Sequence, residues 1–520
     1  MIFTSPYAPV TIPEQSLTEV VLAQAQQRGD KPALIDGPTG RTITYRQLAA
    51  GIRRVAAGLA ARGFGKGDVL AIYSPNIPEY PIAFHAVASL GGITTTINPL
   101  YTVDELVYQL KDAGARYLIT APAFMDKARD AAAQVGLAEV FVFGEAPGAT
   151  PFADLLTSAG EPPAVAIHPR DDLVALPYSS GTTGLAKGVM LTHYNLVANM
   201  TQIDEAIPLT ADDILIGILP FYHIYALELI LNRAIARGTT IVVMPRFDLE
   251  QFLRLIQDYG VTHAFVAPPI VLALAKQPVV EQFDLSKLRL VMSGAAPLGA
   301  DVAQACADRL HCTVKQAYGL TESSPATHIN PADPARIKLA SVGPLIANTE
   351  GKVLDPATDA ELGPNEIGEI CVRGPQVMKG YLNRPEATAA MIDPDGWMHT
   401  GDLGYADAEG YFYVVDRMKE LIKYKGMQVA PAELEALLLT HPDVVDAAVI
   451  PKPDEEAGEI PKAFVVLRGA ADLDAICAYV AARVAPHKRI RAIEAIDQIP
   501  KTASGKILRR VLVARERGGS

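Results

Sequence analysis

The chain has 520 residues, of which 49% are hydrophobic and 20% charged, and its net charge is −12. This length suits three or four domain-sized units. The acidic balance argues against a nucleic acid as the main partner, because binding a phosphate backbone needs a basic face. No apolar run approaches the ~18 residues of a membrane helix, and the first ten residues lack a secretory signal. We therefore expect a cytoplasmic monomer or homodimer without a transmembrane segment.

Up to about residue 415, apolar runs typical of strands alternate with helical patterns. The strand-like runs include 69–73, 117–120, 139–143, 240–244 and 288–292, and the helical ones include 104–113, 249–258 and 300–310. This alternation predicts an α/β fold with parallel sheets covered by helices on both faces. From Glu366 onward, short strands and turns predict a small antiparallel, β-barrel-like part, with strands at 368–374 and 410–415.

A segment rich in glycine and hydroxyl groups runs from Tyr178 to Gly188 and reads Tyr-Ser-Ser-Gly-Thr-Thr-Gly-Leu-Ala-Lys-Gly. Glycine lets backbone N–H groups approach a ligand closely, hydroxyls add donors, and Lys187 adds a positive charge. Such a loop is suited to wrapping a polyphosphate. The kinase and GTPase pattern fails, because Lys187 follows Ala186 and precedes Gly188, and the dinucleotide pattern fails as well. A plain surface loop is the alternative, and the segments that follow disfavour it.

Three later segments of this region are candidates for chemistry. His223 and Tyr225 lie in an aromatic, apolar run, and the small residues at 293–298 follow a predicted strand and leave room for a flat ligand. The run 316–322 ends in adjacent hydroxyl and carboxylate groups, which suit phosphate and Mg2+. Each has a structural alternative when taken alone; a histidine in an apolar run is more often a satisfied core residue.

Three more segments follow toward the C-terminus. The run 396–402 places Asp402 at a turn, where it would suit a ribose diol, and Lys506 lies at the tip of a Gly/Ser turn. Between them, four basic residues surround Glu420: Arg417, Lys419, Lys423 and Lys425. The structural alternatives are a turn former, a solvated charged face and a surface lysine.

We place a domain boundary at 416–419. Residues 1–416 would form a large N-terminal domain, and residues 417–520 a separate α+β domain. In the second domain we expect a helix at 431–440, strands at 444–450 and 463–467, a helix at 471–484 and a basic tail. The four cysteines have no metal-ligand spacing and are expected to be reduced and buried: Cys306, Cys312, Cys371 and Cys477.

Together and in this order, these segments closely resemble one family. The chain resembles the ATP-dependent, AMP-forming acyl- and aryl-CoA synthetases of the adenylate-forming superfamily, above all 4-coumarate:CoA ligases and their bacterial relatives. The resemblance runs from about Thr44 to Leu508, and its most specific segments are 179–188, 316–322, 396–402, 420–432 and 501–508. It implies a large N-terminal domain of packed sheets and helices and a small, mobile C-terminal domain.

The resemblance also implies a two-step reaction. A carboxylate attacks the α-phosphate of Mg-ATP and releases pyrophosphate; the thiolate of coenzyme A then attacks the acyl-AMP and releases AMP. Glu322 matches the Mg2+ ligand, and Lys506 matches the lysine that contacts the α-phosphate and the attacking carboxylate. The matches to ATP- and AMP-binding positions are Ser179, Ser180, Gly181, Thr182, Thr183, Gly184, Lys187, Ala296, Gln316, Ala317, Tyr318, Thr321, Asp402, Arg417 and Lys506.

The other site residues are likewise implied by the resemblance. Catalytic positions are matched by Lys506, His223, Thr321, Glu322, Lys423 and Gln428. Acyl-binding positions are matched by His223, Tyr225, Leu229, Gly294, Ala295, Ala317, Gly319, Pro325 and Ala326. Coenzyme A contacts are matched by Arg246, Lys425 and Gly426. Such enzymes use two orientations of the C-terminal domain, which turn about a hinge at the position of Lys419.

The acyl-binding positions depart from the plant hydroxycinnamate pattern. Leu229 stands where plant enzymes usually have a small or polar residue, Ala317 replaces a common glycine, and Ala326 opens the pocket elsewhere. One methylene changes discrimination by about 1–3 kcal/mol. Hydroxycinnamates, cinnamate-like acids and medium-chain fatty acids therefore all remain candidates.

Three competing functions remain open at this point. An adenylation enzyme that loads a carrier protein would lack the coenzyme A contacts, so Arg246 and Lys425 discriminate against it. A luciferase-like oxygenase would also use an acyl-adenylate but would emit light with luciferin and oxygen. A non-catalytic binding protein is disfavoured by the presence of Lys506, Glu322 and Asp402.

Overall fold

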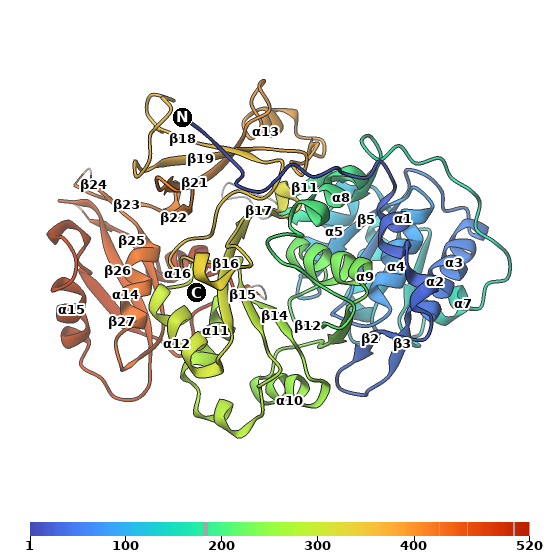
Figure 1. Ribbon diagram of the computed structural model, residues 1–520, viewed down its shortest axis with the longest axis horizontal. Coiled ribbons are helices and arrows are strands. Elements are labelled where there is room, and N and C mark those ends of the chain that lie inside the picture. Colours follow the sequence, from blue (N-terminus) through green and yellow to red (C-terminus); the bar gives the residue numbers. More distant parts are fainter. Residues whose placement is uncertain (180–185, 426, 455, 503–504, 519–520) are drawn as a thin grey trace.

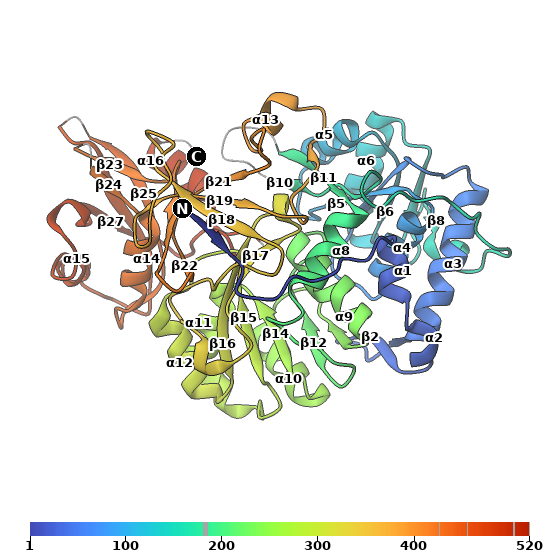
Figure 2. The same cartoon turned by 45° about the horizontal axis from the view of Figure 1, so that its top comes forward.

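The computed structural model describes residues 1–518 except for 180–185, 426, 455 and 503–504. A mixed α/β N-terminal region holds two large sheets and a smaller antiparallel sheet, and a C-terminal α+β domain lies beside it (Figure 1). The N-terminal strand β1 (Ile2–Thr4) joins the antiparallel sheet next to β18 (Glu350–Leu354), whereas the following α1 (Leu17–Leu22) and α2 (Ala25–Arg28) pack among helices of the large sheets (Figure 2).

The first large sheet is parallel through its centre. Its described strands lie in the order β10 (Tyr178–Ser179), β11 (Lys187–Thr192), β9 (Leu173–Ala175), β5 (Ile93–Ile97), β4 (Val69–Tyr73), β6 (Ala115–Thr120), β7 (Glu139–Val142) and β8 (Thr150–Pro151), with β20 (Gly380–Tyr381) added on β11. Its associated helices are α3 (Tyr45–Ala61), α4 (Tyr80–Ser89), α5 (Val103–Ala113), η1 (Pro122–Phe124), α6 (Met125–Val135), α7 (Phe152–Leu156) and α8 (His193–Gln202). All of β4 is buried, as a central parallel strand requires.

The second large sheet carries most of the predicted acyl-binding residues near its strand ends. Its described order is β17 (Ala326–Ile329), β16 (Thr313–Gly319), β15 (Leu290–Ser293), β14 (His263–Val266), β12 (Ile214–Gly217), β13 (Thr240–Val243), β2 (Pro32–Asp36) and β3 (Thr42–Thr44). Between them run the π-helix η2 (Ala226–Asn232), α9 (Arg233–Arg237), α10 (Leu249–Tyr259), α11 (Pro268–Lys276), η3 (Pro278–Gln282), α12 (Ala300–Leu310), η4 (Thr321–Ser323) and η5 (Pro334–Arg336).

Local sequence explains where these helices begin and end. Helix α5 starts at a capping box, in which the Thr102 hydroxyl accepts from Glu105 N–H and the Glu105 carboxylate accepts from Thr102 N–H. It ends at Gly114 in the left-handed conformation. The two large sheets share one core, because Ile72 of β4 and Leu215 of β12 belong to the same buried cluster. This common core fixes the sheets relative to each other.

The smaller sheet is antiparallel, as the short strands predicted. Its described order is β1, β18 (Glu350–Leu354), β19 (Gly368–Arg373), β21 (Met398–Ala406) and β22 (Phe412–Arg417), with α13 (Pro385–Ala389) in a connection. One prediction is wrong here: Asp402 lies within β21 and not at a turn. Asp402 lies opposite Arg417 of β22, so Arg417 also belongs to this sheet. The Gly-Asp sequence suggested a turn, but it lies in a bulge of β21, where Glu369 of β19 accepts a hydrogen bond from Gly401 N–H.

The C-terminal domain is built on a mixed sheet. Its described order is β24 (Met427–Val429), β23 (Ile422–Tyr424), β26 (Gly458–Leu467) and β25 (Val444–Asp454), with β27 (Ala492–Ala495) parallel to β26. Its helices are α14 (Pro431–Leu439), α15 (Leu473–Ala481), η6 (Pro486–Lys488) and α16 (Arg509–Glu516). The β25–β26 hairpin is longer than predicted, because its strands stay paired through Pro451 and Pro461. These prolines and the charges around them favoured a loop.

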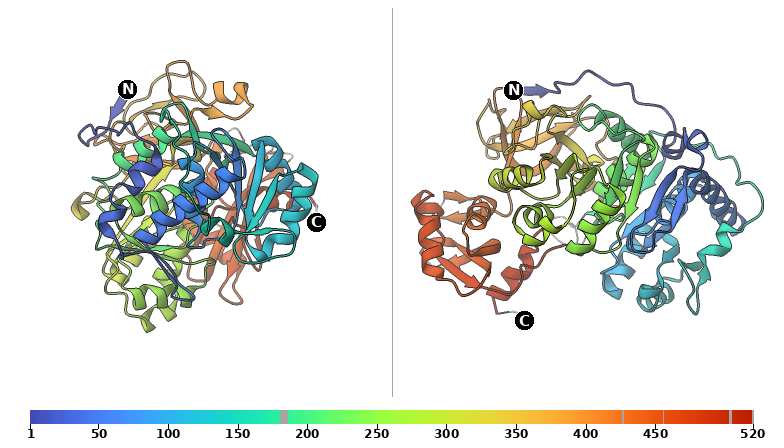
Figure 3. Two further views of the ribbon diagram at one scale, coloured as in Figure 1. Left: turned by 90° about the vertical axis from the view of Figure 1, so that its right-hand side faces the viewer. Right: turned by 60° about the horizontal axis from the view of Figure 1, so that its bottom comes forward.

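The C-terminal domain stands at one side of the molecule, with α16 on the side that faces the rest (Figure 3). Hydrogen bonds join it to the N-terminal part; for example, Ala432 N–H donates to Asp416 Oδ2 over 2.9 Å, and Lys276 Nζ donates to the Leu439 carbonyl over 2.8 Å. Among the described helices, none is long and apolar enough to span a membrane.

Candidate active site

The glycine-rich loop begins and ends on paired strands. Ser179 of β10 lies opposite Lys187 of β11, and the Tyr108 hydroxyl donates to the Ala186 carbonyl over 2.9 Å. The structure therefore fixes both ends of the loop. The predicted residues between them lie outside the described residues: Ser180, Gly181, Thr182, Thr183 and Gly184.

Tyr381 contacts both Lys187 and the Glu322 carboxylate beside this loop. Lys187 Nζ lies 4.5 Å from the centre of the Tyr381 ring, and the Tyr381 hydroxyl donates to Glu322 Oε1 over 2.7 Å. Burial and the nearby Glu322 raise the pKa of Tyr381, so the phenol stays protonated and keeps donating. Tyr381 carries no sequence signal and was missed by sequence reasoning. Glu322 and Thr321 share the short helix η4, and their oxygens are ligands that Mg2+ prefers.

A second cluster surrounds Asp402. The Tyr318 hydroxyl donates to Asp402 Oδ2 over 2.6 Å, and Arg417 Nε lies 3.2 Å from Asp402 Oδ1. Burial raises the pKa of Asp402, and the Arg417 charge and the Tyr318 hydrogen bond counteract that rise. Strand β16 delivers Tyr318, and β21 and β22 deliver the other two residues. The cluster thus offers a buried carboxylate acceptor, as a ribose diol would need.

Lys506 reaches this cluster from the C-terminal domain. It lies on a turn closed by the bridge between Lys501 and Ile507, and its N–H donates to Thr502 Oγ1 over 3.1 Å. The turn presses on the N-terminal part, because a Cβ on Gly505 would come within 2.9 Å of the Ala267 Cβ.

The electrostatics place Lys506 near three predicted site residues. Burial lowers the pKa of Lys506, the Arg417 charge lowers it further, and the Glu420 and Asp402 carboxylates oppose this. Burial, with the charge of Lys506, lowers the pKa of His223 to about 4. Lys506 therefore interacts electrostatically with Asp402, Arg417 and His223, and its neighbour Gly505 packs against Ala267. This is the domain orientation that presents Lys506 to the N-terminal part.

The other predicted catalytic pair is elsewhere. Lys423 and Gln428 lie opposite each other in the β23–β24 hairpin, and both are exposed. The hairpin lies at the outer edge of the C-terminal domain (Figures 1 and 2). Within the described residues, this hairpin is held by its own domain: Lys423 N–H donates to Glu459 over 2.7 Å, and Lys425 Nζ pairs with Glu456 at 2.6 Å.

The predicted coenzyme A contacts that the structure describes lie on different elements. Arg246 is exposed in the turn before α10, whereas Lys425 lies in the β23–β24 hairpin. The third predicted contact, Gly426, lies outside the described residues. Lys419, the predicted hinge, is exposed in the turn that follows β22.

The predicted acyl-binding residues gather around Tyr225. A Cβ on Gly294 would lie 3.1 Å from the Tyr225 ring, and the Tyr225 hydroxyl donates to the Met292 carbonyl over 3.3 Å. Gly319 packs so closely on the Pro325 carbonyl that any side chain there would overlap it. Leu229, Pro325 and Ala326 are buried, Ala317 is half-buried, and Ala295 is exposed with a positive φ of 72°.

Two of the residues predicted to bind ATP or AMP, Gln316 and Ala296, have different surroundings. The buried Gln316 amide donates to the Leu298 and Leu339 carbonyls, so it fixes the backbone on either side of β16. Ala296 follows β15 and is half-buried. Sequence reasoning also missed Glu228, which is fully buried one turn after Tyr225 and bonds Asn232 Nδ2 over 2.7 Å. Burial raises its pKa well above the usual range.

Comparison with known proteins agrees with this geometry. The family model of AMP-binding enzymes matches residues 21–382, and that of the AMP-binding enzyme C-terminal domain matches residues 433–506. The chain is 45% identical over 514 residues to 4-coumarate--CoA ligase 3 of Oryza sativa subsp. japonica, covering 97% of this chain and 93% of the relative. It is 45% identical over 532 residues to 4-coumarate--CoA ligase 1 of Petroselinum crispum, covering 100% and 97%.

Solved structures give the same result. ATP-bound MatB from Rhodopseudomonas palustris aligns with a TM-score of 0.86 and 32% identity, covering 96% of this chain and 98% of that one. The anthranilate CoA ligase AuaEII, in complex with anthranoyl-AMP, aligns with a TM-score of 0.88 and 26% identity, covering 97% and 98%. The chain therefore belongs to the AMP-binding enzyme family and, within it, to the AMP-forming acid–thiol ligases.

Proposed function

We propose that this chain is an ATP-dependent carboxylate–CoA ligase that makes acyl-CoA from an aryl acid of the hydroxycinnamate type, through an acyl-adenylate. The proposal is carried by the turn that holds Lys506: its Gly505 packs against Ala267 of the N-terminal part, and the charge of Lys506 acts on the pKa values of Asp402 and His223. The full-length relatives named 4-coumarate--CoA ligase support the aryl substrate. A medium-chain fatty acid is the second candidate, because Leu229 makes that position apolar.

In the first step, an oxygen of the acid forms a bond to the α-phosphorus of ATP, and the bond to the bridging oxygen of pyrophosphate breaks. Lys506 would stabilise the negative charge that gathers as the two anions meet. Asp402 would accept hydrogen bonds from the ribose hydroxyls, and Lys187 and the adjacent loop would hold the departing phosphates. This work is positioning and charge stabilisation, without a nucleophile from the protein.

The residues present fit a magnesium ion. Glu322 and Thr321 supply oxygens next to the phosphate loop, and the Tyr381 hydroxyl orients the Glu322 carboxylate. A bound Mg2+ would neutralise phosphate charge. Glu322 and Thr321 would hold it.

In the second step, the thiolate of coenzyme A bonds to the acyl carbon and AMP leaves with the bonding electrons. Lys423 and Gln428 would enter the site for this step after the C-terminal domain turns about Lys419. Arg246, Lys425 and Gly426 would contact the coenzyme. His223, uncharged because its pKa is about 4, would separate the acyl site from the thiol path.

A screen of product release tests this function. Aryl acids and fatty acids are offered with Mg-ATP, with and without coenzyme A, and pyrophosphate and AMP are measured separately. We expect pyrophosphate release to require the acid, with hydroxycinnamates preferred, and sustained AMP release to require free coenzyme A. AMP release that ignores coenzyme A but needs a carrier protein would overturn the proposal.

A further inference from the structure

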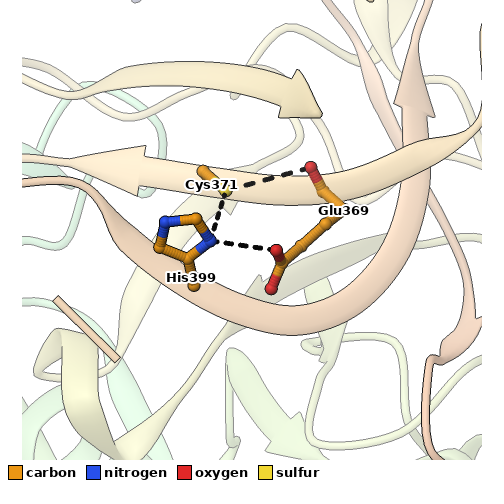
Figure 4. A group of neighbouring side chains, drawn as sticks. All are labelled: Glu369, Cys371 and His399. Atoms are coloured by element: carbon orange, nitrogen blue, oxygen red, sulfur yellow. Dashed lines mark hydrogen bonds and ion pairs between the residues drawn. The ribbon is translucent and has the colours of Figure 1, made fainter. Parts of the chain in front are cut away.

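Glu369, Cys371 and His399 form a group of side chains on β19 and β21, the strand that also carries Asp402. Glu369 and Cys371 of β19 point toward His399 of β21 (Figure 4). His399 Nδ1 lies 2.9 Å from Glu369 Oε2 and 3.5 Å from Cys371 Sγ. Asp393 Oδ2 lies 3.8 Å from the other ring nitrogen of His399.

The strand register explains what this group supports. Glu369 lies opposite Leu403 and Cys371 opposite His399, so three residues of β21 bulge across from a single residue of β19. Asp402 is the last residue of that bulge. Bulges next to active sites commonly aim a side chain.

Hydrogen bonds to β19 and to the turn after β22 hold the backbone of the bulge. Glu369 Oε1 accepts from Gly401 N–H over 2.9 Å, and the Thr400 hydroxyl donates to the Ile370 carbonyl over 2.6 Å. The Gly401 carbonyl accepts from Met418 N–H over 3.0 Å, next to Arg417. Gly401 adopts a φ of 71°, a left-handed conformation that glycine takes without strain. The Glu369 carboxylate therefore ties the backbone immediately before Asp402 to the His399 ring.

The same group does not fit a metal ion. The distance of 2.9 Å between His399 Nδ1 and Glu369 Oε2 is that of a hydrogen bond. Two ligand atoms on a tetrahedral zinc ion lie farther apart, at about 3.3 Å. Glu369 Oε1 already accepts from Gly401. Burial raises the pKa of the Cys371 thiol, whereas a metal needs the thiolate.

We propose that Glu369, oriented by His399, is a positioning residue that aims Asp402 at the ribose of the nucleotide. The inference rests on the proposed function only through the ribose contact of Asp402. It predicts that Glu369 contributes to nucleotide binding when the ribose has its hydroxyls, and much less when it has none.

Binding of ATP and of 2′,3′-dideoxy-ATP, measured by calorimetry with Mg2+ and without an acid, tests this. We expect Glu369→Ala to weaken ATP binding about tenfold, as losing a hydrogen bond to a charged group does, and dideoxy-ATP binding less than twofold. Glu369→Gln keeps a carbonyl acceptor for Gly401 N–H and should stay within about threefold of the parent for ATP. The matched control is Glu350→Ala, which removes the Glu350–Arg373 ion pair of the same sheet and should change neither affinity.

Equal weakening of both nucleotides by Glu369→Ala, or no weakening of ATP, would overturn the inference. Asp402→Ala serves as the reference and should also weaken only ATP. If it weakens both equally, the ribose contact is wrong and the inference falls with it. These affinities are measured without turnover. They therefore test the role of Glu369 separately from the proposed ligase function, which the product screen tests.

Discussion

Two segments of the C-terminal domain were predicted to be catalytic, and they differ in their contacts with the N-terminal part. The turn with Lys506 packs against the N-terminal part through Gly505, and the Lys506 charge interacts with Asp402 and His223. The β23–β24 hairpin with Lys423 and Gln428 is exposed and is held by Glu459 and Glu456 of its own domain. In this orientation the domain presents the Lys506 turn to the N-terminal part and leaves Lys423 and Gln428 exposed. The difference predicts that each segment serves only one half-reaction.

The largest expected effect is that of Lys506→Ala on adenylation. Removing the charge where two anions meet should lower acid-dependent pyrophosphate release by about 100- to 1000-fold. Conversion of a synthetic acyl-AMP to acyl-CoA should stay within a few-fold, because that step uses the other orientation. Both rates are measured on the same enzyme preparation, and an equal loss in both would show that the two segments do not divide the work.

The reverse effect is expected from Lys419→Pro. Proline fixes φ near −65°, so it should hinder the turn of the domain and slow acyl-CoA formation from synthetic acyl-AMP by about 100-fold. Adenylation should change only a few-fold. Single-turnover rates of each step measure this, and undiminished acyl-CoA formation would move the hinge away from Lys419.

A smaller effect is expected from Tyr381→Phe. The change removes the hydroxyl that donates to Glu322 and leaves the ring under Lys187. The Mg2+ concentration for half-maximal pyrophosphate release should rise about tenfold, as for other hydrogen bonds to a charged group. An unchanged Mg2+ requirement would mean that Glu322 needs no such support or is not the ligand.

The smallest effect concerns the pH dependence of His223. Its pKa of about 4 leaves the ring neutral at pH 5.5 and above. His223→Gln should therefore leave the shape of the pH profile of acyl-CoA formation unchanged within about twofold between pH 5.5 and 8. Because the unfolded chain binds this proton near pH 6.5 and the folded one only near pH 4, the free energy of unfolding should fall as the pH drops between these values. A profile that loses an inflection near neutral pH in the variant would contradict the assignment.

Sequence reasoning was most successful where a local pattern decides the structure. The strand at Val69–Tyr73 and the helix at Ala300–Leu310 were predicted with their observed bounds, because continuous apolar runs and amphipathic spacing mark them. Asp402 was assigned to a turn, because the bulge that holds it depends on Glu369, distant in sequence.

Other features depend on packing between distant segments and left no local signal. Tyr381 meets Glu322 only after β20 joins β11, and the contact between Cys371 and His399 joins residues that are 28 positions apart in the sequence. The roles of Ser180 to Gly184 remain predictions, since those residues lie outside the described part of the chain.

The most direct test of the account is the product balance of the parent enzyme with its best acid, ATP and coenzyme A. The account predicts pyrophosphate, AMP and acyl-CoA in equal amounts. Without coenzyme A, pyrophosphate release should stop after about one equivalent per enzyme, and AMP should not accumulate. Formation of ADP and phosphate, or of AMP without acyl-CoA in continued turnover, would contradict it.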